Sequence, residues 1–284
     1  MDETRTIRAQ LAVATARLKS AQIEHPGREA RHLLQFVCAF DAARLISEEL
    51  NELDDALRTR FFDLVERRAA GEPFEYLTGE AHFYGLLLHC SPATLIPRAD
   101  SEVVVDEALT RLPLDRPAMV ADLGTGTACL LIAVMTNHPG LRGVGIERSD
   151  AASAVARQNI ERHGLVGRAQ ILTGGWEAWG GWGQADLIIS NPPYIVHDVI
   201  ETLEPGVKAY EPHEALDGGT DGLDAYRSLI SLAAEGMKPD AWLVLEIGFD
   251  QRETVSALLH EAGFNAISSV QDMGQNDRVV CAKR

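Results

Sequence analysis

The chain has 284 residues, and 26 Lys and Arg against 42 Asp and Glu give it a formal net charge of −16. At about 100–200 residues per domain, this length suggests one large domain or two modest ones. With 46% hydrophobic and 24% charged residues, the composition is that of a soluble globular protein and excludes disorder across the whole chain. Because so acidic a protein would repel a polyphosphate backbone, we expect no direct binding to nucleic acid.

The cysteines Cys38, Cys90, Cys129 and Cys281 are far apart and form no C-x-x-C pair. They therefore indicate neither a disulfide framework nor a zinc site, and we expect no bound metal. The N-terminal segment is charged from its second residue and is not typical of a secretory signal. No run of about 18 apolar residues occurs, so we expect no membrane span. These features together favour a cytoplasmic protein, which we expect to be a monomer.

The first part of the chain has the periodicity of helices. From residue 4 to about residue 70, apolar residues recur three and four apart, as in Leu57, Phe61, Leu64 and Val65. Breakers between the helices lie at residues 25–27, 51–55 and 71–73. We predict a small helical bundle domain over residues 1–72. The two short apolar runs around Gly85 then predict a β-hairpin in a linking segment, residues 73–95.

Residues 96–284 have the pattern of an α/β domain. After an amphipathic helix at residues 101–111, short β-rich runs alternate with helical patterns. These runs lie at residues 119–123, 141–146, 169–172, 186–189, 242–247, 266–270 and 278–282. Such alternation requires a mostly parallel sheet that is covered by helices on both faces, so we predict a doubly wound, Rossmann-like fold.

A glycine turn follows the first of these strands. Asp122-Leu123-Gly124-Thr125-Gly126-Thr127-Ala128 runs from the strand into a helix. Glycines at such a turn let the backbone approach a ligand closely, and the helix N-terminus offers free N–H groups. A dinucleotide-binding fingerprint would have Gly or Ala at its third position, where this chain has Cys129. A turn that merely needs small residues is the alternative for this segment alone.

Glu147 ends the next β-rich run, and in a doubly wound sheet it would face the same crevice as the glycine turn. A carboxylate there can accept hydrogen bonds from both ribose hydroxyls, although a solvated loop carboxylate explains Glu147 equally well on its own. Turn and carboxylate together predict a nucleoside site. The negative charge of Asp122 would repel a pyrophosphate but suits an ammonium or sulfonium ligand. This points toward S-adenosylmethionine.

The decisive motif is Asn191-Pro192-Pro193-Tyr194, placed where the fourth parallel strand should end. The residue before a proline is pushed out of the helical region and each proline fixes its own φ, so the motif is a stiff, extended projection. It offers the Pro192 carbonyl and the Asn191 side-chain oxygen as acceptors to a planar NH₂ group. Tyr194 adds an aromatic face against that plane. A proline-rich loop without a function is the alternative.

These motifs resemble those of class I methyltransferases that methylate a planar amide or exocyclic amino nitrogen. Further stretches narrow the resemblance to the HemK/PrmC family, the peptide chain release factor N5-glutamine methyltransferases. They are Leu77-Thr78-Gly79, residues 91–102, Tyr210-Glu211-Pro212, residues 215–219 and Asp277-Arg278-Val279. The match covers nearly the whole chain. It implies a class I methyltransferase fold with a seven-stranded sheet and a helical N-terminal domain that recognises the substrate.

The resemblance also implies residue roles. Asp122, Gly124, Thr125, Gly126, Thr127, Ala128, Glu147, Trp176 and Asn191 would bind S-adenosylmethionine, with Glu147 on the ribose and Trp176 along the adenine. Asn191, Pro192, Pro193 and Tyr194 would hold the substrate glutamine, with Asn191, Pro192 and Tyr194 catalytic. The chain departs from the family, which often has Gly at Ala128, Pro at Ala99, Thr at Ser101 and Asp at Gly175. Ala128 adds a methyl group at the turn, which is tolerable if its φ is negative.

The reaction implied is methyl transfer to the side-chain amide nitrogen of the glutamine in the Gly-Gly-Gln motif of class 1 release factors. A ribosomal-protein glutamine methyltransferase is the nearest alternative. A DNA adenine methyltransferase shares the logic of the motif but needs a basic face. A non-catalytic scaffold is the alternative from another class. For Arg98, a local ion-pair network with Asp100 and Glu102 and a supporting role at the active site stay equally open.

Overall fold

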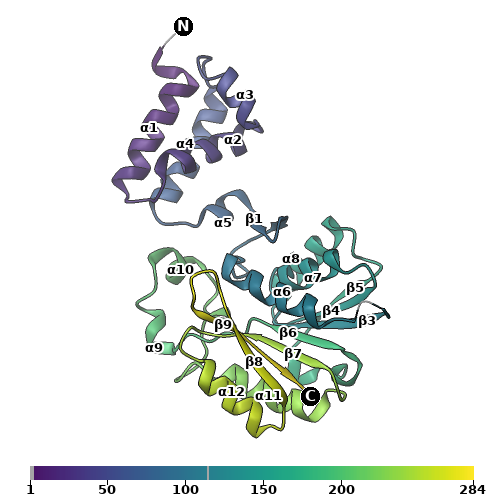
Figure 1. Cartoon of the computed structure of the whole chain (residues 1–284). Coiled ribbons are helices and arrows are strands. Elements are labelled where there is room, and N and C mark those ends of the chain that lie inside the picture. Colours follow the sequence, from purple (N-terminus) through teal and green to yellow (C-terminus); the bar gives the residue numbers. More distant parts are fainter. Residues whose placement is uncertain (1–2, 114) are drawn as a thin grey trace. The chain divides into compact units, whose positions relative to one another are not determined.

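The computed structural model describes residues 3–113 and 115–284, which form two compact units (Figure 1). The first unit comprises the described residues up to Gly79 together with Pro205–Tyr210. The second comprises Glu80–Glu204 and Glu211–Arg284. All residues of the predicted site fall in the second unit.

The first unit is helical, as its periodicity predicts. Its elements are η1 (Glu3–Arg5), α1 (Ile7–Ser20), α2 (Pro26–Cys38), α3 (Ala42–Ser47), α4 (Asp55–Ala69), α5 (Phe74–Thr78) and α10 (Pro205–Tyr210). The side chains of Thr6, Asp41 and Asp54 cap α1, α3 and α4 by accepting backbone N–H groups. One break was not predicted: Ala39 adopts a left-handed conformation that ends α2. A buried cluster that includes Leu33, Leu34 and Phe61 forms the core of this unit.

The second unit begins with the predicted hairpin, in which β1 (Glu80–Phe83) pairs antiparallel with β2 (Leu86–His89). Tyr84 and Gly85 connect the strands, and both have positive φ, at 50° and 74°. Two consecutive left-handed residues give the turn the twist that a two-residue hairpin requires. Asn159 then ties the end of β2 to the rest of the unit, since its side chain accepts from the His89 N–H and donates to the His89 carbonyl.

A seven-stranded sheet forms the centre of the second unit, in the order β5-β4-β3-β6-β7-β9-β8. The strands are β3 (Ala118–Leu123), β4 (Leu141–Glu147), β5 (Ala169–Thr173), β6 (Leu187–Ser190), β7 (Trp242–Glu246), β8 (Asn265–Gln271) and β9 (Asp277–Lys283). The pairs among β3 to β7 are parallel, and β9 runs antiparallel to both of its neighbours. The predicted fold class, a mostly parallel doubly wound sheet, is confirmed.

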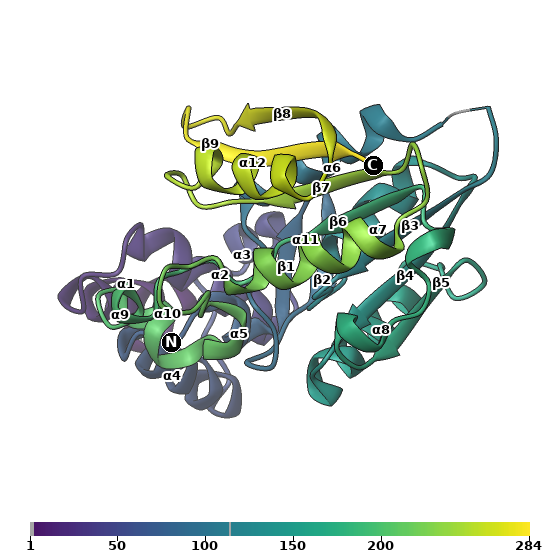
Figure 2. The ribbon, with the colours of Figure 1, turned by 90° about the horizontal axis from the view of Figure 1, so that it is seen from below.

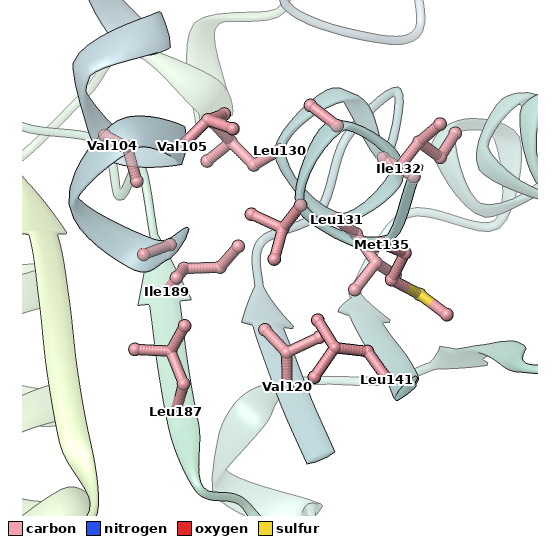
Figure 3. Close-up of a cluster of buried hydrophobic side chains, with 14 of the residues drawn as sticks. Val104, Val105, Val120, Leu130, Leu131, Ile132, Met135, Leu141, Leu187 and Ile189 are labelled. Carbon is pink, nitrogen blue, oxygen red and sulfur yellow. The ribbon is translucent and has the colours of Figure 1, made fainter. Parts of the chain in front are cut away.

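Helices cover both faces of this sheet. The helices of the second unit are α6 (Glu102–Arg111), α7 (Cys129–Asn137), α8 (Asp150–Arg162), α9 (His197–Ile200), α11 (Asp224–Gly236) and α12 (Arg252–Glu261), with short 3-10 turns at η2 (Ala99–Ser101), η3 (Trp176–Ala178), η4 (Trp182–Gln184) and η5 (His213–Ala215). On one face α6 and α7 pack over β3 and β6, so that Leu131 lies among Val120, Leu187 and Ile189 (Figure 3). On the other face lie α11 and α12 (Figure 2).

The alternation of side chains along the strands explains why both faces are buried. Val120 of β3 packs against α7, whereas its neighbour Ala121 belongs to the cluster under α11 and α12. Strands that are buried on both faces read as continuous apolar runs, which is how β6, with Leu187, Ile188 and Ile189 fully buried, appears in the sequence. The parallel strands all end at one edge of the sheet, which brings the loops after them together.

Candidate active site

A cavity of about 870 Å³ lies at the carboxyl edge of the parallel strands. Its lining comes from the loops that follow β3, β4, β5 and β6, together with the segment before α6 and residues just after α10. The predicted site residues among its lining are Gly124, Thr125, Gly126, Thr127, Glu147, Trp176, Asn191 and Pro193. Ligands of open α/β sheets bind in this crevice, at the point where the strand order reverses, here between β3 and β6.

The glycine turn after β3 is held against β4 by its backbone. The N–H groups of Gly124 and Thr125 both donate to the carbonyl of Ile146, at 2.9 and 3.1 Å. Gly124 and Gly126 have φ values of 72° and 53°, in the left-handed region that glycine adopts without strain. A side chain at Gly124 would also stand in van der Waals contact with the Trp176 ring. The two glycines are therefore required by the path of the backbone and keep the floor of the cavity open.

Ala128 ends this turn with a φ of 63°, so the condition of a negative φ is not met there. The turn has to convert a strand into α7 within a few residues, and it does so through left-handed conformations at Gly124, Gly126 and Ala128. Ala128 is fully buried and does not line the cavity. The left-handed conformation costs a residue with a Cβ about 1–2 kcal/mol, so this position holds strain.

Glu147, the last residue of β4, is anchored by the backbone on both sides. Its Oε2 accepts from the N–H of Gly126 at 2.9 Å, and its Oε1 accepts from the N–H of Ser149 at 2.9 Å. These two bonds hold a mostly buried carboxylate in one orientation at the wall of the cavity. Each oxygen of a carboxylate has two lone pairs, so each of them can accept one further hydrogen bond. A pair of neighbouring hydroxyls on a ligand would complete this set.

Asp122 lies beneath the turn and is 1% exposed. Thr125 donates to its Oδ2 at 2.5 Å, whereas its buried Oδ1 has no hydrogen-bond partner among the described residues. Burial raises the pKa of Asp122 to about 7, although the Thr125 hydroxyl and the backbone N–H of Leu131 lower it. An incompletely satisfied buried carboxylate is costly unless a positive charge comes near. This observation fits a cationic ligand in the cavity above the turn.

Trp176 follows β5 and lines the cavity with its ring beside Gly124. Its indole N–H donates to Ser228 Oγ at 3.3 Å, which fixes the plane of the ring. The neighbouring Gly175 has no side chain, and a Cβ there would collide with the carboxylate of Glu177. Glu177 also lines the cavity. An acidic group is therefore present beside Trp176, although it comes from two residues further along the chain than in the resembling family.

Asn191 extends from the end of β6 to the cavity, half-buried, and its NH₂ group donates to Ser101 Oγ at 3.3 Å. Tyr194 turns away from the cavity and donates its hydroxyl to Glu246 Oε1 at 3.4 Å. Its carbonyl accepts from Gln251 Nε2 at 3.0 Å. Burial and the Glu246 carboxylate raise the pKa of the Tyr194 phenol. The motif is thus clamped at its far end, while its first residue faces the cavity.

Similarity to known proteins identifies the family of the chain. The family model "PrmC N-terminal domain" matches residues 10–79, and "Methyltransferase small domain" matches residues 104–203. The release factor glutamine methyltransferase of Caulobacter vibrioides is 39% identical over 277 residues, which cover 98% of this chain and 96% of that protein. The one of Geobacter sulfurreducens is 39% identical over 275 residues, which cover 97% and 95%. The chain belongs to the release factor glutamine methyltransferase family.

Solved structures agree on the fold. A T. thermophilus 16S rRNA N2 G1207 methyltransferase, solved with AdoMet and guanosine, matches with a TM-score of 0.51 and 20% identity over 72% of this chain and 49% of that chain. A methyltransferase from Pyrococcus furiosus matches with a TM-score of 0.50 and 14% identity over 81% and 98%. The predicted family and enzyme class are confirmed, and family membership decides against a DNA adenine methyltransferase.

Within this family site, the structure separates the predicted residues into two groups. The cavity brings together most of the glycine turn, Glu147, Trp176, Asn191 and Pro193. Asp122, Ala128, Pro192 and Tyr194 do not line it. Asp122 and Ala128 lie under the turn, and Tyr194 points to Glu246. The roles assigned to individual residues stay predictions.

Arg98 and Glu211 form a pair that the sequence did not reveal. The Arg98 guanidinium, which lines the cavity, forms an ion pair with the Glu211 carboxylate. The Glu211 side chain is 1% exposed, and its Oε2 also accepts from the Ile96 N–H at 3.2 Å. Asp100 and Glu102 have other partners, namely Arg278 and the Tyr84 N–H. The partner of Arg98 is therefore distant in sequence, and it lies buried behind the wall of the site to which Arg98 belongs.

Within the part of the chain that the structure describes, residues 3–113 and 115–284, no group of three or more His, Cys, Asp or Glu side chains is arranged to hold a metal ion. None of the helices in these residues is long and apolar enough to cross a membrane. The four cysteines are free thiols.

Proposed function

We propose that this protein transfers a methyl group from S-adenosylmethionine to the side-chain amide nitrogen of the glutamine in the Gly-Gly-Gln motif of class 1 peptide chain release factors. The observation that carries the proposal is the orientation of Asn191. Its NH₂ group is engaged by Ser101, so its oxygen is the free edge beside a cavity of nucleoside-binding character. A hydrogen-bond acceptor in that place selects a substrate that presents N–H groups.

The cofactor half of the cavity is the part next to β3, β4 and β5. Glu147 would accept hydrogen bonds from the ribose hydroxyls, and Trp176 would pack along the adenine. The turn from Gly124 to Thr127 lies against the methionine end, with Asp122 beneath it. When bound, the cofactor supplies an electrophilic methyl group on a positively charged sulfur. The buried negative charge of Asp122, with its unpartnered oxygen, favours such a cation.

The substrate half is the motif after β6. A carboxamide nitrogen is a poor nucleophile because its lone pair is delocalised into the carbonyl group. Asn191 Oδ1 and the Pro192 carbonyl would each accept a hydrogen bond from one of its two N–H groups and so would hold the nitrogen toward the methyl group of the cofactor. Such positioning supplies up to about 7–11 kcal/mol of the barrier. Pro193 lines the cavity and keeps the segment extended, and Tyr194 holds its far end. Water takes the proton from the methylated amide.

The protein partner is a class 1 release factor, and neither nucleic acid nor a membrane is needed. An enzyme with a net charge of −16 is drawn to a basic protein surface. We assign recognition of the factor to the helical unit, because every cofactor and substrate residue lies in the other unit. In this proposal the enzyme acts as a monomer in the cytoplasm.

The test is methyl transfer from labelled S-adenosylmethionine to purified class 1 release factors, followed by peptide mass mapping. A methyl group on the Gly-Gly-Gln glutamine is the expected result. Purified ribosomal proteins, tested in parallel, distinguish the nearest alternative. The Asn191→Ala variant is the control for adventitious activity. Label on a ribosomal protein alone, or no label with a folded enzyme that binds the cofactor, would refute the proposal.

A further inference from the structure

A chain of polar groups runs from Asn191 through Ser101, which also lines the cavity, to the buried carboxyl group of Glu246. Asn191 donates to the Ser101 hydroxyl, which is 3% exposed and stands at the end of η2. The Ser101 hydroxyl lies next to the carboxyl group of Glu246, at the end of β7, where as a hydrogen-bond donor it lowers the pKa of that group. Glu246 is 2% exposed and takes no part in the chemistry described above. Within the described residues, no donor lies in good hydrogen-bonding geometry to its Oε2 atom.

The direction of the hydrogen bonds from Asn191 through Ser101 to Glu246 decides which edge of the Asn191 amide faces the substrate. A hydroxyl has one proton to donate, and a carboxylate only accepts. With Glu246 ionised, Ser101 donates toward Glu246 and its lone pairs accept from Asn191. The amide of Asn191 must then present its NH₂ group to Ser101 and its oxygen to the opposite side. With Glu246 protonated, the order can reverse, and Asn191 can present NH₂ to the substrate, where it would oppose the N–H groups of a carboxamide.

We infer that Glu246, acting through the Ser101 hydroxyl, sets the orientation of the Asn191 amide and that both are positioning residues for methyl transfer. The inference rests on the proposed function, because only a substrate that donates N–H groups requires the oxygen of Asn191. It adds a reason for a buried carboxyl group at the end of β7, a place where burial without full hydrogen bonding is costly. Neither residue needs to touch the substrate.

The surroundings of Glu246 hold it in place from several elements. The Tyr226 hydroxyl donates to its backbone carbonyl at 2.8 Å, and Tyr194 donates to its Oε1. Burial raises the pKa of Glu246 to about 7, against the Ser101 hydrogen bond, the positive charge of Arg278 and the Tyr194 hydroxyl, which lower it. The titratable and charged groups that face it are Asp100 before α6, Cys129 at the start of α7, Tyr194 after β6, Tyr226 on α11 and Arg278 on β9. Its ionisation therefore falls in a range accessible to kinetics.

The test is single-turnover methylation of the release factor at saturating cofactor, with the cofactor dissociation constant measured separately by calorimetry. We expect Ser101→Ala and Glu246→Gln each to slow methyl transfer by about ten- to a hundredfold and to change the cofactor dissociation constant less than about twofold. Ser101→Thr retains a hydroxyl and should restore a rate near that of the wild type. Because both residues act through one chain, the double variant should be no slower than the slower single variant.

The pH profile separates this role from a structural one. In the wild type, the rate should fall as the pH drops below about 7, where Glu246 gains a proton, and Glu246→Gln should lose this dependence. The matched control is Tyr226→Phe, which removes a buried hydrogen bond to the Glu246 backbone but leaves the chain to Asn191 intact. It should lower the melting temperature and keep the rate and its pH dependence.

The possible results distinguish failure of this inference from failure of the proposed function. If the wild type methylates the factor while Ser101→Ala keeps the full rate, the inference is wrong and the proposed function stands. Multiplicative losses in the double variant, or a Ser101→Thr variant as slow as Ser101→Ala with normal folding, would also overturn the inference. If the wild type itself transfers no methyl group to the glutamine, the proposed function fails.

Discussion

The buried carboxyl group of Asp122 predicts that cofactor binding depends on pH. Burial raises its pKa to about 7, so it is partly protonated near neutral pH in the free protein. A cation in the cavity favours the ionised form, since opposite charges stabilise each other at low dielectric. If only the ionised form binds tightly, the apparent dissociation constant is the intrinsic value divided by the ionised fraction.

The size of the effect follows from that fraction. With a pKa of about 7, roughly 9% of the protein is ionised at pH 6 and roughly 76% at pH 7.5, so the affinity should rise about eightfold over this interval. The sign is fixed, because protonation removes the charge that attracts the ligand. Calorimetry in buffers of different ionisation enthalpy should also show protons released on binding at pH 6.

The Asp122→Asn variant supplies the control. It should bind the cofactor more weakly at pH 7.5 and should lose most of the pH dependence. Because a raised carboxyl pKa means that the folded state resists ionisation, the wild-type free energy of unfolding without cofactor should fall as the pH rises from about 4 to about 7. In the Asp122→Asn variant this decrease in the free energy of unfolding should be absent. In the wild type it amounts to up to about 4 kcal/mol, at about 1.36 kcal/mol per pKa unit. An Asp122→Asn protein with unchanged affinity and the same pH dependence would refute this reasoning.

Further predictions test the remaining parts of the site. Glu147→Ala should weaken cofactor binding by about 1.5–3 kcal/mol per lost hydrogen bond while kcat at saturation stays near normal; calorimetry and kinetics separate the two. Asn191→Ala should lose about two orders of magnitude in kcat/KM with normal cofactor affinity, and a smaller loss would contradict its role. Ala128→Gly should raise the free energy of unfolding by up to about 1 kcal/mol in urea titrations, because relief of about 1–2 kcal/mol of left-handed strain exceeds the burial of one methyl group, about 0.8 kcal/mol. Arg98→Ala should destabilise the protein more than Glu211→Gln, because it leaves a buried carboxylate without its cation, and the reverse order in denaturation would argue against a buried charge there.

The sequence predicts the sheet of this protein well because parallel strands have a simple signature. β6 is buried along its whole length, so its apolar run is uninterrupted, and the Asn-Pro-Pro-Tyr motif marks its end. Helices such as α11 bury one side only and show the matching period. The break at Ala39 was missed because a left-handed alanine leaves no local mark in the sequence. There the tertiary packing of the bundle overrides local preference.

In the candidate site, too, the sequence predicts the residues that follow a local rule and misses those that depend on tertiary contacts. Glu147 was predicted because it ends a strand beside the glycine turn, and the same rule applies to Glu246, which ends β7 and was overlooked. Glu211 lies 113 residues from its partner Arg98, so no spacing rule could pair them. The positive φ of Ala128 did have a signal in the resemblance, because the family often has Gly at this position and glycine is favoured where φ is positive.

Three carboxyl groups at the edge of the sheet show how stability and function oppose each other here. Glu147 has a backbone N–H on each oxygen, so its charge is stabilised before any ligand arrives. Asp122 and Glu246 each have an oxygen without a geometric hydrogen-bond partner among the described residues, and burial raises both pKa values to about 7. A sheet selected for stability alone would hold neutral side chains at those two places. One of them lies under the cofactor turn and the other behind the substrate motif, so each half of the reaction has its own incompletely satisfied charge. Occupancy of the cofactor half should therefore stabilise the fold through Asp122 and leave the ionisation of Glu246 to govern the rate.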